Sequence, residues 1–249
     1  MRSVIAIVLV CLIGASVAMG AAGKGSGKAP IARPAQKESV TLDGDKYVVQ
    51  WLAREPFDKS WASRWATEGD CEVKAEGGKL WVKGVKVAKI NSATIWFRKE
   101  LPADLIVRFR AKVLPPKEEN AANLNVIFNA RELDSGPVIF GRSGVYGEYH
   151  EIPNYIITLT GGVQPGWSRV RRNPGFRMLH ESDVRSEVGK QYQIVVTVQK
   201  GRIRYYVDGH KYHDVRDPSP LPGGRFAFRT WSTNAWWSDV QFGQVLSSK

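Results

Sequence analysis

The sequence has very little cysteine, which limits how the folded chain can be stabilised. Its 249 residues include only Cys11 and Cys71, and Cys11 lies in an apolar run near the amino terminus. If this run is removed as a secretory signal, Cys71 remains alone. One thiol cannot form an internal disulfide or a cysteine-ligated zinc site, so the fold must depend on its hydrophobic core.

The chain also has no apolar run long enough to span a bilayer. The run Val4–Ile13 has only about ten residues, follows Arg2, and precedes small residues up to Ala22. This pattern predicts a signal peptide over residues 1–20 and export to the periplasm or the extracellular space. Residues 21–38 are rich in Gly, Ala, Lys and Pro, which predicts a flexible linker. We expect residues 39–249 to form one domain, a monomer with no integral membrane segment.

Acidic residues are the minority among the charged ones. The chain has 36 Lys and Arg against 24 Asp and Glu, and loss of Arg2 with the signal leaves 35 − 24 = +11. This excess favours an anionic partner such as acidic polysaccharide, a membrane surface or nucleic acid. Export makes nucleic acid the least suitable of these, and we predict none. The alternative is that the charge serves solubility alone.

A sustained helical period is missing, and alternation at period two takes its place. In Asp104–Val113, apolar residues alternate with mostly charged ones, as expected for a half-buried strand. Turn signals such as Lys200-Gly201 and Asp208-Gly209 predict two successive hairpins. One short helix or looped strand is expected within Arg54–Trp65. The fold class is therefore all-β, a two-sheet antiparallel sandwich. Its other predicted strands are Tyr47–Leu52, Leu80–Val85, Thr94–Arg98, Leu124–Ala130, Tyr155–Thr160, Trp167–Arg171, Tyr192–Gln199, Ile203–Val207, Phe226–Trp231 and Val240–Val245.

Several predicted strands carry amides, guanidiniums and indoles on the face opposite their apolar residues. Asparagine is depleted in strands, so three at period two in Asn123–Ala130 call for a reason. If these faces share one sheet, aromatic rings would pack on a sugar while the polar groups bind its hydroxyls. Otherwise each is an ordinary solvated face of a separate sheet. The predicted substrate-binding residues are Asn125, Asn129, Trp96, Tyr155, Trp167, Arg169, Arg171, Arg229 and Trp231.

Some motifs resemble those of a known group. Tyr149-His150-Glu151 before a strand and the run Trp167–Phe176 resemble the YesU-like proteins, as do the hairpin Gly201–Gly209 and the closing strands Gly224–Phe242. The resemblance covers about Val40–Val245. It implies a concanavalin A-like jelly roll akin to 3-keto-disaccharide hydrolase domains, met in bacterial carbohydrate degradation. It carries over no catalytic residue.

The segment Glu148–Glu151 holds the candidate catalytic groups. The laminarinase-like enzymes of this fold use alternating carboxylates, whereas Glu148 and Glu151 have opposite parity in an extended strand and would not pair across a glycosidic bond. We therefore predict His150 as a general base with Glu148 beside it, and the arginines holding the developing negative charge. This chemistry suits eliminative cleavage of uronates or 3-keto-glycosides. The alternative for His150 is a loop histidine bonded to a neighbour.

Other histidines and metal ligands receive weaker expectations. His180 is a second candidate base, while His210 and His213 flank a hairpin turn and are expected to be solvated. The metal-binding H-E-x-x-H spacing is absent, so no metal ligand is assigned, with a divalent metal at Glu148–Glu151 left as an alternative. Three functions remain: an enzyme acting on an acidic or 3-keto glycoside (a hydrolase or lyase), a noncatalytic carbohydrate-binding module, and a surface protein that binds polyanions by charge.

Overall fold

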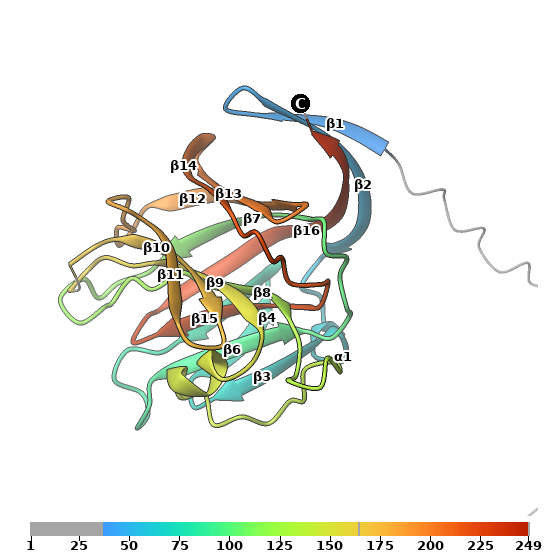
Figure 1. Ribbon diagram of the computed structural model, residues 1–249. Coiled ribbons are helices and arrows are strands. Elements are labelled where there is room, and N and C mark those ends of the chain that lie inside the picture. Colours follow the sequence, from blue (N-terminus) through green and yellow to red (C-terminus); the bar gives the residue numbers. More distant parts are fainter. Residues whose placement is uncertain (1–36, 164, 249) are drawn as a thin grey trace, which may run out of the picture. The chain divides into compact units, whose positions relative to one another are not determined.

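The described residues, 37–163 and 165–248 of the computed structural model, form two antiparallel sheets that face each other (Figure 1). The nine-stranded sheet, sheet A, has the order β1-β2-β16-β7-β12-β13-β14, with β5 also paired to β16 and β4 paired to β5. Its strands are β1 Lys37–Leu42, β2 Asp45–Glu55, β4 Glu72–Glu76, β5 Lys79–Lys83, β7 Leu105–Val113, β12 Gln191–Gln199, β13 Arg202–Val207, β14 His210–Arg216 and β16 Ala235–Ser248.

The seven-stranded sheet, sheet B, has the order β11-β10-β9-β8-β15-β6-β3. Its edge strand β11 lies against β14, the edge strand of sheet A. The strands are β3 Trp65–Gly69, β6 Ser92–Phe97, β8 Asn125–Ala130, β9 Asn154–Leu159, β10 Ser168–Asn173, β11 Arg177–Ser182 and β15 Arg225–Trp231. A short helix, α1 Trp61–Arg64, precedes β3, and a 3-10 helix spans Tyr146–His150.

The main core fills the space between the sheets. Leu105, Val107 and Phe109 of β7 point into it, as their alternation predicts. All eleven predicted strands overlap strands of the structure, and the hairpins at Lys200-Gly201 and Asp208-Gly209 join β12, β13 and β14. The predicted antiparallel sandwich is confirmed. The strands that alternation missed are β1, β3, β4, β11 and β14, most of which are short, polar and at sheet edges.

The predicted faces of strand β8 are wrong at its carboxyl end, at Asn129 and Ala130. Asn129 has a positive φ of 50°, and the pairing of β8 with β15 shifts register nearby. The resulting bulge turns Asn129 inward, where its side-chain amide donates to the carbonyls of Ala103 and Leu221. Ala130, predicted on the core face, instead joins an apolar cluster on the outer face of sheet B.

That outer cluster shows how half of sheet B is covered. Trp96, Ile127 and Ile156 project from the outer face and pack under Tyr149 and Ile152 of the loop that follows β8. The rest of this outer face, over β8, β9, β10 and β15, is left accessible, which leaves room for a pocket there.

The domain boundaries predicted from sequence lie mostly outside the described residues. This applies to the signal peptide and to most of the linker, while β1 begins at Lys37, just before the predicted domain start. The described part of the chain includes no helix with the length and apolar character that a membrane crossing needs.

Candidate functional site

A pocket of about 500 Å³ opens on the outer face of sheet B. Four neighbouring strands, β8, β9, β10 and β15, and the segment around the 3-10 helix form its walls. The faces that alternation grouped as polar therefore do belong to one sheet. The pocket is lined by Ile90, Asn123, Asn125, Val145, Tyr146, Thr158, Thr160, Trp167, Arg169, Arg171, Phe176, Arg229 and Trp231.

The lining combines aromatic rings and aliphatic side chains with small polar groups. Trp231 is 41% exposed and Phe176 is also exposed, so both rings have accessible surface at the pocket. Asn123, Thr158 and Thr160 are buried, and each contributes an amide or hydroxyl to the lining. Such pockets, apolar with a few placed polar groups, are typical small-ligand sites.

Arg229 is the most deeply placed charge in the pocket. Its side chain is only 3% exposed, and its guanidinium lies 4.2 Å from the centre of the Tyr146 ring. Its hydrogen bond to the carbonyl of Gly144 is long at 3.4 Å, and its Nε has no partner among the described residues. Burial lowers the pKa of Arg229, because the charged form has lost its water.

Arg171 is in a similar state. It is 6% exposed, stacks over Phe176 at 4.2 Å and has no hydrogen-bond partner at Nε. Burial lowers its pKa as well. Within residues 37–163 and 165–248, neither Arg171 nor Arg229 forms an ion pair. Arg169 differs, since its Nε donates to Glu181 Oε2 at 2.7 Å while its guanidinium lies over Trp167.

Tyr146 lies between these cations. Its hydroxyl is buried and has no partner among the described residues. Burial raises the pKa of this phenol, and the charges of Arg229, Arg171 and Arg169 oppose that rise without reversing it. The phenol therefore stays protonated at neutral pH.

The predicted catalytic pair does not line the pocket. The segment is a 3-10 helix rather than an extended strand, so the parity used to separate Glu148 from Glu151 does not apply. The His150 ring lies behind Tyr146 and Phe176, with centroid distances of 4.2 and 3.9 Å. Burial, followed by the charges of Arg229 and Arg171, lowers the pKa of His150 to about 4. Glu148 accepts a hydrogen bond from Ser143 Oγ.

Three predicted substrate-binding residues also lie elsewhere. Trp96 is fully buried under the loop after β8, and its indole N–H donates to Glu68. Tyr155 faces the core between the sheets and donates to Asp217. Asn129 turns inward at its bulge. The structure brings Asn125, Trp167, Arg169, Arg171, Arg229 and Trp231 together in the pocket.

The remaining histidines divide differently from the prediction. His210 is exposed, as expected, but His213 is buried, because its side chain points toward sheet B instead of the solvent. Its ring contacts His180 and Ser168. Within the described residues, no three His, Cys, Asp or Glu side chains gather as metal ligands.

Sequence reasoning missed Tyr146, Thr158 and Thr160 in the pocket. The two threonines alternate with Tyr155, Ile157 and Leu159, whose apolar face marks the core side of β9. This alternation is a signal that could have located Thr158 and Thr160 on the outer face, beside Asn125. Tyr146 gave no such signal, because it lies in a loop.

Residues 87–240 match a family model described as a domain of unknown function, DUF6250. This range covers more than half of the chain and holds every pocket residue. The chain belongs to the DUF6250 family. A search of curated proteins found no match to this DUF6250 protein.

Solved structures resemble the DUF6250 protein in fold at low identity. A Bacillus subtilis protein of unknown function with a galectin-like fold has 17% identity and a TM-score of 0.70, covering 84% of this chain and 99% of its own. An endo-β-1,3-glucanase from Pyrococcus furiosus has 11% identity and a TM-score of 0.56, with coverages of 84% and 99%. The carbohydrate-binding module CBM66 from Bacillus subtilis has 14% identity and a TM-score of 0.50, with coverages of 71% and 93%.

These likenesses agree with the predicted jelly roll. They do not test the closer resemblance to YesU-like proteins, which stays a prediction.

Proposed function

We propose that this DUF6250 protein binds an acidic saccharide, as part of an oligosaccharide or polysaccharide, in the pocket on the outer face of sheet B. The observation that carries the proposal is the pair of buried arginines, Arg171 and Arg229, that share one pocket and have no carboxylate partner in the described chain.

The physical reason is the cost of an uncompensated buried charge. An unpaired buried ion costs several kcal/mol after relaxation, so such groups are normally paired. A ligand carboxylate or sulfate at this position would supply the missing charge and accept directional hydrogen bonds from the guanidiniums. The lowered pKa values of both arginines express the same deficit.

The rest of the lining suits a sugar ring. Trp231 and Trp167 offer flat apolar faces, and Asn125 and Thr158 lie nearby with groups that pair with hydroxyls. The names of two structural neighbours, a carbohydrate-binding module and a glucanase, support a carbohydrate ligand. The predicted export and monomeric state belong to the same proposal; light scattering of the purified protein checks the latter.

Recognition fits this pocket better than hydrolysis. Its described lining includes no Asp, Glu or His, so it has no pair of carboxylates for a glycosidase and no imidazole base. The noncatalytic carbohydrate-binding alternative therefore becomes the leading one, and His150 becomes a support behind Tyr146 and Phe176.

Tyr146 favours a second candidate function, eliminative cleavage of a uronate or 3-keto glycoside. Its phenol has no partner among the described residues. Burial raises its pKa, and the charges of Arg229, Arg171 and Arg169 reduce that rise. The reaction would use the ionised fraction of Tyr146, which is small at neutral pH and grows with pH. This phenolate would take the proton next to the carboxylate or ketone while the glycosidic C–O bond breaks, and the leaving oxygen would take a proton from water. Absorbance of the new conjugated double bond, present with wild type and absent with Tyr146→Phe, tests this function.

Binding to a panel of immobilised acidic and neutral polysaccharides tests the main proposal. Arg229→Met and Arg110→Met form a matched pair, because each removes one positive charge and Arg110 is exposed on the outer face of sheet A. We expect retention on acidic polysaccharides for wild type and Arg110→Met, and loss for Arg229→Met. Equal losses in both variants would indicate binding by net charge. If wild type were retained equally on neutral and acidic polysaccharides, the proposal of an acidic ligand would be wrong.

A further inference from the structure

The two sheets meet along one side, where the edge strand β11 of sheet B lies against the edge strand β14 of sheet A. A short chain of polar contacts crosses this junction. His213 of β14 is 1% exposed, and its Nδ1 lies 2.8 Å from Nδ1 of His180 in β11. Its Nε2 lies 2.8 Å from the hydroxyl oxygen of Ser168 in β10.

The number of protons on the two rings decides whether this contact holds. When both rings are neutral, one Nδ1 donates and the other accepts, and Ser168 takes the role that remains. One extra proton is also tolerated, since a charged ring still donates to its neutral neighbour. With both rings charged, two N–H groups face each other across 2.8 Å. The contact then becomes repulsive and cannot persist.

The same junction supports one wall of the pocket. Ser168 stands between Trp167 and Arg169, and both of these line the pocket. Glu181, next to His180, holds Arg169 by an ion pair of 2.7 Å. The turn between β10 and β11 carries Phe176, over which Arg171 stacks. The hairpin formed by β10 and β11 thus carries four pocket residues on one side and the histidine contact on the other.

We propose that His180, His213 and Ser168 form a pH-sensitive clamp that positions the β10–β11 hairpin, so that ligand binding in the pocket weakens in acid. The predicted effect of the clamp on ligand binding rests on the proposed function. The existence of the clamp does not depend on that function. The three residues act on the ligand only through the position of Trp167, Arg169 and Arg171.

The surrounding charges leave the pair without an acidic partner. Glu181, Asp214 and Asp217 lie on or beside the strands that meet here, and each bonds to arginine. The Tyr205 ring, 5.8 Å from His213, has a pKa that burial raises. Burial and His180 also lower the pKa of His213 to about 4. These ion pairs join Arg169 to Glu181, Arg172 and Arg177 to Asp217, and Arg202 and Arg204 to Asp214.

The first test needs no ligand. The four histidines of the chain give separate imidazole signals in NMR, which His180→Gln and His210→Gln assign. We expect the His213 signal to titrate at about pH 4 and to shift in His180→Gln, whereas the His210 signal should not respond to His180→Gln. Independent titration of His213 near 6.5, unaffected by His180→Gln, would overturn the clamp.

The second test measures binding of dextran sulfate, whose charge does not change over this range, between about pH 7 and pH 4. By pH 4, where about half of the pairs are doubly charged, wild type and His210→Gln should lose affinity about twofold, and His180→Gln, which cannot form the doubly charged pair, should keep its affinity. The same loss in His180→Gln and wild type would overturn the regulation of the pocket.

Hydrogen exchange of Ser168–Ser182 supplies a readout that is independent of binding. After correction for intrinsic rates, this hairpin should become less protected in acid in wild type and stay protected in His180→Gln. A total lack of dextran sulfate binding at all pH values would count against the saccharide proposal and the pocket half of this inference. The imidazole titration and the exchange would still decide whether the clamp exists.

Discussion

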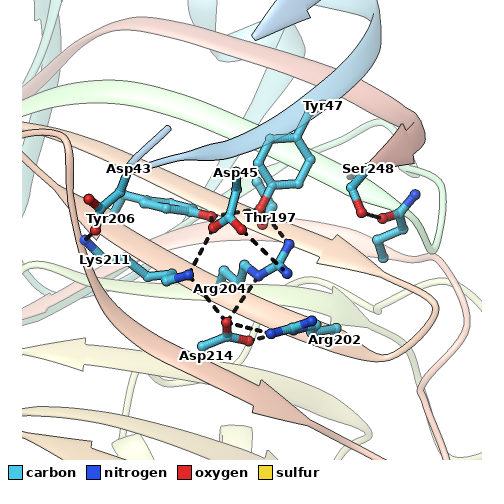
Figure 2. A network of polar contacts seen from close by, with 11 residues as sticks. Asp43, Asp45, Tyr47, Thr197, Arg202, Arg204, Tyr206, Lys211, Asp214 and Ser248 are labelled. Atoms are coloured by element: carbon cyan, nitrogen blue, oxygen red, sulfur yellow. Dashed lines mark hydrogen bonds and ion pairs between the residues drawn. The ribbon is translucent and has the colours of Figure 1, made fainter. Parts of the chain in front are cut away.

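Arg204 in sheet A and Arg229 in sheet B are both buried arginines, and they differ in what surrounds them. Arg204 is 7% exposed and Arg229 is 3% exposed, so both have lost most of their water. Figure 2 shows Arg204 within a network of polar contacts near the β1–β2 hairpin. Arg229 instead opens onto a pocket, where in the described chain its guanidinium lies over the rings of Tyr146 and Tyr149 and bonds to the carbonyl of Gly144.

The network around Arg204 satisfies its charge. Its guanidinium bonds to Asp214 at 3.2 Å, lies 3.6 Å from Asp45 and donates to the Tyr47 hydroxyl at 2.9 Å. Burial lowers the pKa of Arg204, but the Tyr47 hydrogen bond and the two carboxylates outweigh it, so the pKa is raised. The pKa of Arg229 moves the other way. A paired buried arginine stabilises the fold, whereas an unpaired one, we infer, is kept for a ligand.

The largest effect should follow from removing the unpaired charge. Arg229→Met should lower affinity for an acidic saccharide by about 100-fold, the loss expected for a buried partner of a ligand charge. Its free energy of unfolding should stay the same or rise, because a buried charge without a partner is replaced by an apolar chain of similar length. Calorimetric titration and urea unfolding measure the two quantities. A large drop in stability would show that Arg229 is structural.

The paired arginine should give the opposite pattern. Arg204→Met leaves Asp45 and Asp214 with fewer cations, so the free energy of unfolding should fall by about 3 kcal/mol. Saccharide affinity should be unchanged, because the network lies in the other sheet. Urea unfolding and calorimetry again provide the measurements, and a loss of affinity with intact stability would remove the contrast between the two arginines.

Acid should reduce stability in two stages. Burial lowers the pKa of His150 and His213 to about 4, below the value of about 6.5 expected in the unfolded chain. The unfolded chain therefore takes up these protons first, and stability falls as the pH drops from about 6.5 to about 4, by on the order of 3 kcal/mol for a fully buried ring. Urea unfolding at a series of pH values measures this fall, and His213→Gln should reduce its size.

The second stage concerns the network. Burial raises the pKa of Asp214, but hydrogen bonds and charges from Arg202 and Arg204 lower it to about 2. Asp45 is lowered as well, through Tyr206 and Lys211. These carboxylates stabilise the fold above about pH 4, and that contribution is lost as the pH falls toward about 2. In Arg204→Met this stage should shrink, whereas in Arg229→Met it should remain.

A smaller effect is expected at the aromatic rim. Trp231→Ala should reduce saccharide affinity by about 1–2 kcal/mol, because the exposed indole loses its stacking surface while the arginines remain. Trp81→Ala, on sheet A, is the control and should not change affinity. Equal affinity for wild type and Trp231→Ala would show that charge alone holds the ligand.

How far the sequence predicts this arrangement depends on the kind of element. Alternation located β7 and β15 because one face of each is apolar, and it grouped Arg229 with Trp231 for the same reason. It failed at Asn129, where a left-handed residue reverses the faces, and at the 3-10 helix Tyr146–His150, where period two has no meaning.

The burial of His213 and Trp96 could not be predicted from local sequence patterns. His213 follows a hairpin turn, a local signal for exposure, yet the edge of sheet B covers it. Trp96 has the pattern of an outer-face residue and is covered by a loop distant in sequence. Both depend on contacts between elements far apart in the chain, which local patterns do not contain.

One measurement tests the central claim, that Arg229 is reserved for an acidic group, most directly. It is a double-mutant cycle by calorimetry, with wild type and Arg229→Met each titrated with a uronate oligosaccharide and with the same oligosaccharide after reduction of its carboxylates to alcohols. We predict a coupling free energy of about 2 kcal/mol or more between the guanidinium and the carboxylate. Coupling indistinguishable from zero, with both saccharides losing affinity equally in Arg229→Met, would contradict the account.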